Sequence, residues 1–384
     1  MKPYRVLLCS TFLHQLLIYS VRPYVSLLAD ELGASSMQIG LLIMLSSVLP
    51  VVMALPIASW VNRFGCRRLT VLAGVLYLPA CGMLAAARAL ALIAAAMLLL
   101  GMAYTLELTT LQFQSTRGDL GAPASSVIGY YTLCNSLGVS AGSFVGGQLN
   151  ELLGTNLCFA GSFVIALINL AVVWMLRAPD LTVQREASGT IREVLTTENM
   201  PAILICGGLT MYALEIVNTY FPLYGKEIGL SPAQIGIVLS VSGIGQLVIR
   251  PFMHSLTRRA PLFILLGVFM AISGVGILCF GFAESYLLCI AIAAWTGVSL
   301  GILNPLCLFA VTATVELARR AKALAVRVMV NFTGQAIGPV GFGALAGAAG
   351  YRAVFWVSGA MLLAGALINR GRRLPPQAED ALRQ

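Results

Sequence analysis

The chain has 384 residues, of which 59% are hydrophobic and only 10% are charged, and its mean hydropathy is +0.89. Soluble domains carry roughly a quarter of charged residues, so this composition excludes a protein whose surface faces mainly water. The net charge of +9 does not predict binding to nucleic acid, because most basic residues fall in loops on one side of the predicted membrane helices.

Apolar runs long enough to cross about 30 Å of hydrocarbon as helices follow one another along the whole chain. The sequence lacks the alternating hydrophobicity of a membrane barrel, so the predicted fold class is an all-α integral membrane protein with twelve transmembrane helices. The first six cover residues 5–29, 37–61, 69–87, 90–113, 127–150 and 156–176. The second six cover residues 201–225, 232–256, 262–282, 286–310, 323–348 and 352–370.

One stretch of sequence occurs twice, at an offset of 196 residues. The segment from Tyr24 to Gly40 shares Tyr, Leu, Glu, Gly, Ser and a terminal Gln-Ile-Gly with the segment from Tyr220 to Gly236. The same offset relates other glycine and asparagine positions, among them Asn135 and Asn331. Two homologous membrane halves predict a transporter whose halves rock about a shared site.

A polar stretch between the halves predicts a linker on the cytoplasmic side. Arginine-rich loops such as Arg67-Arg68 and Arg258-Arg259 place both termini on that side, because cytoplasmic loops are rich in Lys and Arg. We expect the chain to lie in a bacterial inner (plasma) membrane. The predicted parts are an N-terminal six-helix bundle (1–177), a cytoplasmic linker (178–200), a C-terminal six-helix bundle (201–370) and a cytoplasmic tail (371–384).

The loop after the second predicted helix resembles the loop signature of the major facilitator superfamily. Arg63, Gly65 and Arg67 match that signature, whereas Ala58 and Asn62 stand where the family has a glycine and an acidic residue. The resemblance spans essentially the whole chain and implies two pseudo-symmetric six-helix bundles. The family uses a charge contact here to latch the outward-open state, and a hydrogen bond from Asn62 can replace it.

Glycines in predicted helices five and eleven resemble those of the superfamily's drug/proton antiporters, an efflux branch. They are Gly138 and Gly142 in helix five, and Gly334 and Gly338 with Pro339 in helix eleven. Such a stripe lets two helices approach closely and slide; ordinary tight packing is an equally good interpretation. Helix four lacks the arginine that this branch usually has, so the branch's usual route of proton coupling is not implied.

Five charged residues fall inside predicted helices: Arg22, Glu107, Glu215, Arg250 and Arg327. Each costs about 2.5–3.5 kcal/mol to insert, so the default interpretation is a cavity, a gate or a proton path. We expect Glu107 to pair with Arg327 or Arg250 near the cytoplasmic side, as an inner gate or a structural pair. His14 can relay protons, although a histidine bonded to a neighbouring hydroxyl or backbone group is the simpler expectation.

Helices one and seven are related by the repeat and predict a central site. Helical spacing places Gln15, Tyr19 and Arg22 on one face, and Met211, Glu215 and Asn218 on another. In the fold that this chain resembles, both helices line the central cavity with helices four and ten. One hypothesis is that Glu215 changes protonation or binds a cationic group, with Arg22 as its partner. The alternative is a static pair that closes the outer gate.

Aromatic residues, including Tyr104 and Trp295, can build an apolar pocket for an amphipathic organic molecule, although most such stripes only pack. The sequence contains no paired nucleophile and base and no metal cluster, which disfavours an enzyme, and it predicts no cofactor. We expect a monomeric secondary active transporter that exports a small organic compound in exchange for protons. An importer of a metabolite, by facilitation or proton symport, and a lipid-handling protein on the same scaffold are the alternatives.

Overall fold

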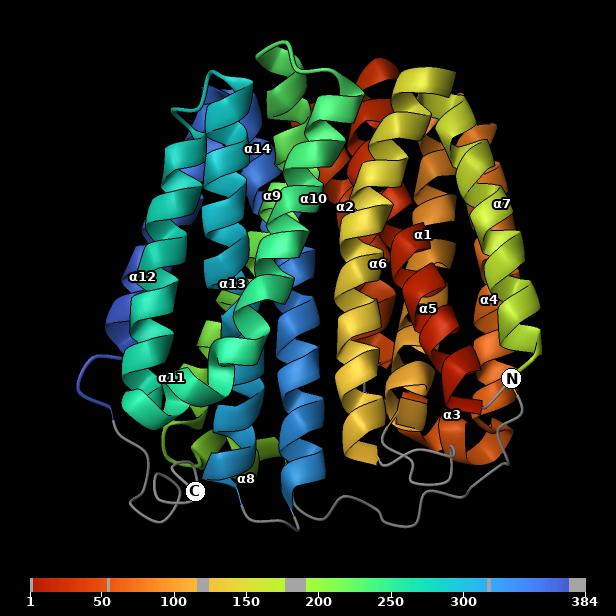
Figure 1. The fold of residues 1–384 in the computed structure, drawn as a ribbon. Coiled ribbons are helices and arrows are strands. Elements are labelled where there is room, and N and C mark those ends of the chain that lie inside the picture. The colour runs from red at the N-terminus through yellow and green to blue at the C-terminus, as the bar shows by residue number, and fades with distance from the viewer. Residues whose placement is uncertain (1–2, 54–55, 116–123, 177–190, 316–318, 373–384) are drawn as a thin grey trace.

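The computed structural model describes residues 3–53, 56–115, 124–176, 191–315 and 319–372. Most of the predicted linker (177–190) and tail (373–384) lies outside these residues. Every secondary-structure element within them is a helix (Figure 1). The N-terminal half contains α1 (Pro3–Glu31), α2 (Ser36–Met53), α3 (Ile57–Phe64), α4 (Cys66–Ala85), α5 (Leu90–Ser115), α6 (Ala124–Leu153) and α7 (Thr155–Trp174).

The C-terminal half repeats this order after a short helix, α8. Its elements are α8 (Ile191–Thr196), α9 (Met200–Glu227), α10 (Pro232–Ile249), η1 (Arg250–Phe252), α11 (Met253–Arg259), α12 (Leu262–Phe280), α13 (Tyr286–Thr314) and α14 (Arg320–Ile368). The offset of 196 residues carries the bounds of α2 onto those of α10 without adjustment. It also relates Gly154 to Gly350, whose φ angles of 80° and 79° interrupt the helical path at equivalent points.

The predicted fold class, an all-α membrane protein with two six-helix bundles, is confirmed. By length and composition, nine helices among the described residues can cross a membrane. α14 counts once among them although Gly350 divides it into two helical stretches. α1 and α6 have 29 and 30 residues, long enough to cross, but polar side chains such as His14 and Asn150 lower their hydropathy. The two halves therefore supply six membrane helices each.

Two predicted helices were too long. The second, expected over 37–61, ends as α2 at Met53, and a separate helix α3 follows. The eighth, expected over 232–256, ends as α10 at Ile249, and Pro251 lies in the 3₁₀ turn that follows. Proline lacks the backbone N–H that an α-helix needs at this point, which accounts for the break. Both short helices, α3 and α11, lie with α8 at one end of the molecule, called here the linker end (Figure 1).

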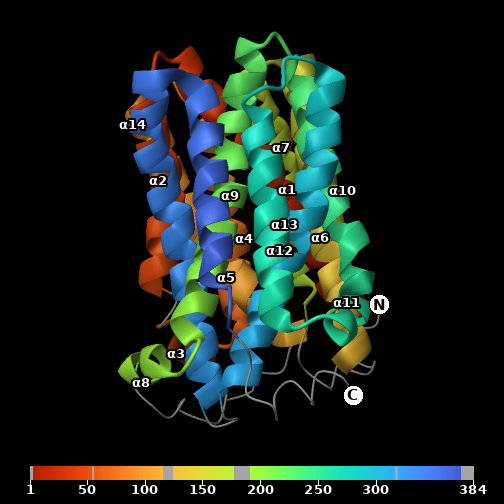
Figure 2. The same cartoon turned by 90° about the vertical axis from the view of Figure 1, so that its left-hand side faces the viewer.

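The halves meet along two helix pairs that the repeat relates to each other. α2 packs against α14, and α10 packs against α6. Figure 2 shows the two pairs on opposite sides of the molecule. Two tyrosines tie the packing together, because the Tyr24 hydroxyl donates to the Ser143 carbonyl at 2.8 Å and the equivalent Tyr220 hydroxyl donates to the Pro339 carbonyl.

Glycines allow the backbones of the two halves to touch at the end opposite the linker end. A Cβ atom on Gly147 would lie 2.8 Å from the Pro232 carbonyl oxygen of α10, and one on Gly343 would lie 2.6 Å from the Ser36 carbonyl oxygen of α2. Real Cβ atoms do not approach other atoms so closely. The structure therefore has this end closed, and closure depends on residues without side chains.

We predict that Gly343→Ala forces the halves apart at this end. The added methyl group would also meet the Met37 Cα at 2.9 Å, and the rigid backbone of α2 cannot move aside. The distance between spin labels on the exposed residues Ser35 and Ala348 should increase relative to the wild type.

Gly341→Ala is the matched control, because a Cβ at Gly341 has nothing within 4 Å. It should leave the label distance unchanged and tolerate heat as well as the wild type, since alanine favours a helix over glycine by about 1 kcal/mol. Equal distances in both variants would contradict the role of Gly343.

Candidate functional site

An ion pair joins the two halves inside the membrane. The Arg22 Nη2 of α1 lies 2.9 Å from the Glu215 Oε1 of α9, and the side chains are only 13% and 6% exposed. The same Nη2 also donates to the Ser46 hydroxyl of α2 at 3.0 Å. The structure thus brings together the two charges that the repeat placed on facing helices. In a medium of low dielectric such a pair interacts far more strongly than it would in water.

A small cavity lies beside this pair, between the halves. It is lined by Tyr19 of α1, by Leu214 and Asn218 of α9, and by Gln246 and Leu300 of α10 and α13, among others. Its open space is about 10 Å³, roughly what one water molecule requires. Both Tyr19 and Asn218 were predicted to line the central site. The cavity holds no room for an organic substrate until the halves separate.

The remaining predicted site residues divide between this centre and the surface. Tyr104 stacks on His14 with ring centroids 5.4 Å apart, and its edge meets Phe332 of the other half. Gln15 is buried at the contact of α1 with α6. The predicted role of Trp295 in a pocket is not supported, because its side chain is 46% exposed and lies next to Gly276 of α12.

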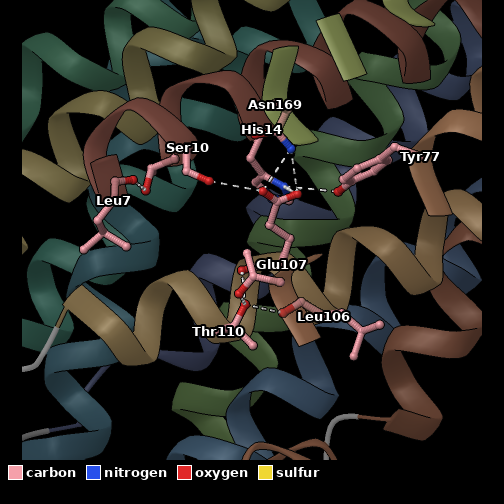
Figure 3. A network of polar contacts seen from close by, with 10 residues as sticks. Leu7, Ser10, His14, Tyr77, Leu106, Glu107, Thr110 and Asn169 are labelled. Atoms are coloured by element: carbon pink, nitrogen blue, oxygen red, sulfur yellow. Dashed lines mark hydrogen bonds and ion pairs between the residues drawn. The ribbon is translucent and has the colours of Figure 1, made fainter. Parts of the chain in front are cut away.

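A second cluster of polar groups lies wholly inside the N-terminal half (Figure 3). Glu107 is fully buried, and the Asn169 Nδ2 lies 3.0 and 3.1 Å from its two carboxylate oxygens. The His14 Nδ1 lies 3.2 Å from the Glu107 Oε2 and 3.1 Å from the Tyr77 hydroxyl. The Ser10 hydroxyl adds a long contact of 3.4 Å. Four helices, α1, α4, α5 and α7, therefore converge on one carboxylate.

The geometry restricts where protons can sit in this cluster. Because carboxylate oxygens only accept hydrogen bonds, the Nδ1 of His14 carries a proton and donates it to Glu107 whenever Glu107 is ionised. The Nε2 of His14 is buried and has no hydrogen-bond partner among the described residues. A second proton on that nitrogen would make a charged pair with Glu107, and its absence leaves a neutral donor.

The predicted pairing of Glu107 with Arg327 or Arg250 is wrong. Glu107 pairs with His14, while the Arg327 Nη1 donates to the Asn304 Oδ1 at 3.0 Å and the Arg250 Nη1 donates to the Thr132 carbonyl at 3.0 Å. The position of a residue along its helix does not say which way its side chain points. The expectation that His14 bonds to a neighbouring hydroxyl is confirmed by Tyr77.

Sequence reasoning missed several polar partners in these clusters. Asn169 and Tyr77 each lie within an otherwise apolar helix, and an amide buried in such a helix must find a partner there. That signal was present in the sequence. Ser46, which accepts from Arg22, lies beside Ser47 among apolar residues of α2 and was not singled out.

The residues of the loop motif lie at the linker end. Gly65 has φ 80°, a backbone conformation that favours glycine, and it separates α3 from α4. The Arg67 Nη2 donates to the Trp174 carbonyl at the end of α7 at 3.4 Å, and the Arg63 guanidinium lies over the Phe64 ring. The side chain of Asn62 lies outside the described part of the structure, so its predicted latch remains a prediction.

The predicted glycine stripes lie at close helix contacts within each half. Cβ atoms on Gly138 and Gly142 would meet the carbonyl oxygens of Phe12 and Leu16 in α1, each at 2.6 Å. In the C-terminal half, Gly334 faces the backbone of α9 in the same way. A further set of contacts places Gly338 against the Tyr212 ring and Met211 against the Gln335 amide, 3.6 Å from sulfur to nitrogen. These stripes let α1 and α9 pack closely against α6 and α14.

Among the described residues, no group of three or more His, Cys, Asp or Glu side chains could hold a metal ion. The carboxylates of Glu107 and Glu215 instead belong to two separate features. One is the Arg22–Glu215 pair between the halves, and the other is the cluster around Glu107.

Comparison with known proteins supports a common architecture. The chain matches the sequence model of the Major Facilitator Superfamily over residues 7–227 and again over residues 203–383. No curated protein matches it. Its structure is similar to a mutant of the nucleoside transporter NupG, with a TM-score of 0.80, 15% identity and 100% of both chains covered.

Two other solved structures have similar scores. One is a bacterial homologue of the human lysosomal transporter Spinster, with a TM-score of 0.78 and 15% identity over 98% of this chain and 100% of that one. The other is a D-xylose-proton symporter, with a TM-score of 0.77 and 14% identity over 98% of both chains. At these identities the likeness concerns the fold.

We predict that His14 and Glu107 stabilise the fold as a unit. His14→Leu leaves a buried carboxylate without its strongest donor, which should lower the free energy of unfolding by about 3–5 kcal/mol. The double variant His14→Leu with Glu107→Leu should lose less stability than the two single variants added together. Unfolding in detergent micelles measures all three.

Thr210→Val is the matched control, because Thr210 occupies the equivalent position in the C-terminal half and its hydroxyl bonds only to the Cys206 carbonyl of its own helix. It should change stability little. Strict additivity of the His14 and Glu107 effects would show that the two residues are not coupled.

Proposed function

The chain belongs to the Major Facilitator Superfamily, and from that premise we propose that it is a proton-coupled secondary transporter that exports a small organic compound. The family and the fold support a transporter that works by alternating access, rather than an enzyme. Coupling to protons, export and a drug-like, metabolite-like or metallophore-like substrate are the further content of the proposal. The Arg22–Glu215 pair between the halves carries it.

The pair supplies a reason for coupling. Whenever the halves separate at its level, Arg22 and Glu215 must part, and breaking a buried pair costs about 3–5 kcal/mol if both groups stay charged. A proton on Glu215, or a cationic group of the substrate beside it, removes most of that cost. Exchange of one for the other therefore links the binding of a ligand to the motion of the halves.

The glycine stripe of α6 supports the export direction, through its resemblance to the drug/proton antiporters. The second charged cluster offers a proton store in the same half, since His14 and Glu107 lie next to Tyr104, whose ring contacts the other half. Import remains the second candidate, because the same pair would couple an inward flux equally well.

Orientation and assembly complete the proposal. The linker end carries exposed arginines, among them Arg63, Arg67, Arg258 and Arg259. Cytoplasmic loops are rich in Lys and Arg, which supports the proposal that this end lies on the cytoplasmic side of a bacterial inner membrane. Both termini then lie in the cytoplasm, and the closed end faces outward. We also propose that the chain consists of two bundles, with a linker between them at 178–200 and a tail at 371–384. We propose a monomer that interacts with lipid, protons and a small molecule, and with no nucleic acid.

We predict that Glu215→Gln uncouples transport from protons. Purified protein in proteoliposomes, with an imposed pH gradient, should accumulate substrate at least about tenfold less than the wild type, a loss that corresponds to about 1.4 kcal/mol. The amide cannot ionise, so transport that remains should no longer depend on the gradient. Unchanged transport with unchanged pH dependence would remove Glu215 from the mechanism.

Two controls separate coupling from structure. Lys226 and Asp30 form a second pair between α9 and α1, at 2.7 Å, but it is exposed, so Asp30→Asn should leave transport nearly unchanged. The double charge reversal Arg22→Glu with Glu215→Arg tests the static alternative. Full activity in that variant would show that the pair only holds the halves together.

We predict that transport is outward, and the same vesicles, loaded with a panel of drugs, metallophores, sugars and organic acids, test the direction. Antiport predicts that a compound moves against its own gradient, opposite to the flow of protons. Movement with the protons would assign a symporter, and flux that ignores the pH gradient would assign facilitated diffusion.

A further inference from the structure

Arg327 is a buried cation without a carboxylate. Its side chain is 8% exposed, and among the described residues no Asp or Glu lies within ion-pair distance. Its one hydrogen bond runs from Nη1 to the neutral Asn304 Oδ1, and its Nε has no partner. Arg22, by contrast, has Glu215. A guanidinium in a membrane interior stays charged, so Arg327 holds a positive charge that no carboxylate in the described part of the chain neutralises.

Polar groups continue from Arg327 along one face of α14. Asn331 and Gln335 follow at intervals of four residues, which places them above Arg327 on the same side of the helix. The Asn331 Oδ1 lies beside Gly207 of α9, and the Gln335 Nε2 donates to the Met211 sulfur. The amide oxygens of both residues lack a hydrogen-bond partner. This face therefore presents unused donors and acceptors toward α9.

These groups form a column that leads to the central cavity. On α9, Asn331 contacts Gly207 and Gln335 contacts Met211, one turn further from the linker end. Leu214, about one turn beyond Met211, lines the cavity. Along α13, Leu300 lines the cavity and Asn304, one turn toward the linker end, accepts from Arg327. Eight residues of helix separate Arg327 from Gln335, about 12 Å at 1.5 Å per residue. The column thus runs from the cavity toward the linker end.

We infer that Arg327 binds an anionic group of the substrate, a carboxylate or a phosphate, and that the transported compound is a small organic anion. This rests on the proposed function as a transporter and names the class of its substrate. The guanidinium offers a planar fork that matches either anion, and the bond to Asn304 fixes its orientation. The free amide oxygens of Asn331 and Gln335 accept N–H or O–H groups from the rest of the molecule.

The site belongs to one half only. The repeat places Tyr131 where the C-terminal half has Arg327, and Leu108 where it has Asn304. A single anion site on one half is what a single substrate molecule needs. Arg250 also lacks a carboxylate, but its guanidinium donates to the Thr132 carbonyl across the halves, and it provides a matched comparison.

Binding of simple anions to the purified full-length protein tests this inference without any transport. The melting temperature is measured in detergent with inorganic phosphate or with succinate, against chloride at the same ionic strength. The wild type should be stabilised by several degrees by at least one of the two probes, and the stronger probe distinguishes a phosphate from a carboxylate site. Arg327→Gln should lose this shift, whereas Arg250→Gln should retain it.

The melting temperature without added anion gives a second readout. Because Arg327 carries an unneutralised charge, Arg327→Gln should be at least as stable as the wild type in chloride. Arg327→Lys keeps the charge but lacks the planar guanidinium, so the anions should shift its melting temperature less than that of the wild type. This variant replaces Arg327→Gln in the test if the glutamine variant does not fold.

Two results would overturn the inference. One is that neither probe stabilises the wild type, and the other is that both Arg327 variants show the same shift in melting temperature as the wild type. Failure of the proposed function is a different outcome. A protein that binds anions through Arg327 but shows no flux driven by a pH gradient would refute proton coupling alone. Glu215→Gln should retain the anion shift in either case.

Discussion

A charge inside hydrocarbon is costly unless it is paired, and this constraint explains how Glu107, Arg22 and Glu215 are placed in the interior of the chain. The cost of an unpaired ion is several kcal/mol even where water reaches it, so each charged side chain determines what lies next to it. Glu107 is contacted by side chains of α1 and α7, and Arg22 pairs with Glu215 of the other half. The first arrangement fixes the packing inside one half. The second ties two halves that have to move relative to each other.

Close backbone contact supplies the opposing requirement. The halves touch through glycines at the end away from the linker, next to two tyrosine hydroxyls that each bond to a backbone carbonyl of their own half. Such contacts depend on shape rather than charge, and they form or break with little change in hydration. The Arg22–Glu215 pair depends on charge. Under the proposed function, binding of a proton or a ligand near the pair shifts the balance between closed and open halves. The glycine contacts are the ones made in the closed arrangement.

The sequence predicted the fold well because the repeat constrained it twice. The offset of 196 residues fixed α2 and α10 to the same bounds, and hydrophobic length fixed the remaining spans. The facing of Arg22 and Glu215 followed from the same symmetry. The partner of Glu107 did not, because hydropathy gives the depth of a residue and not its direction around the helix. His14 and Asn169 come from α1 and α7, whose packing against α5 depends on side-chain shapes that a pattern of apolar residues does not contain.

The two halves share a backbone but differ in charge. At the positions of His14 and Glu107 the C-terminal half has Thr210 and Leu303, and at the position of Arg327 the N-terminal half has Tyr131. Duplication supplied the symmetric helices, and the buried ions occupy positions where the copies have diverged. Glu107 and its donors lie in the N-terminal half, whereas Arg327 lies in the C-terminal half. The two halves therefore differ in buried charge although their helices correspond.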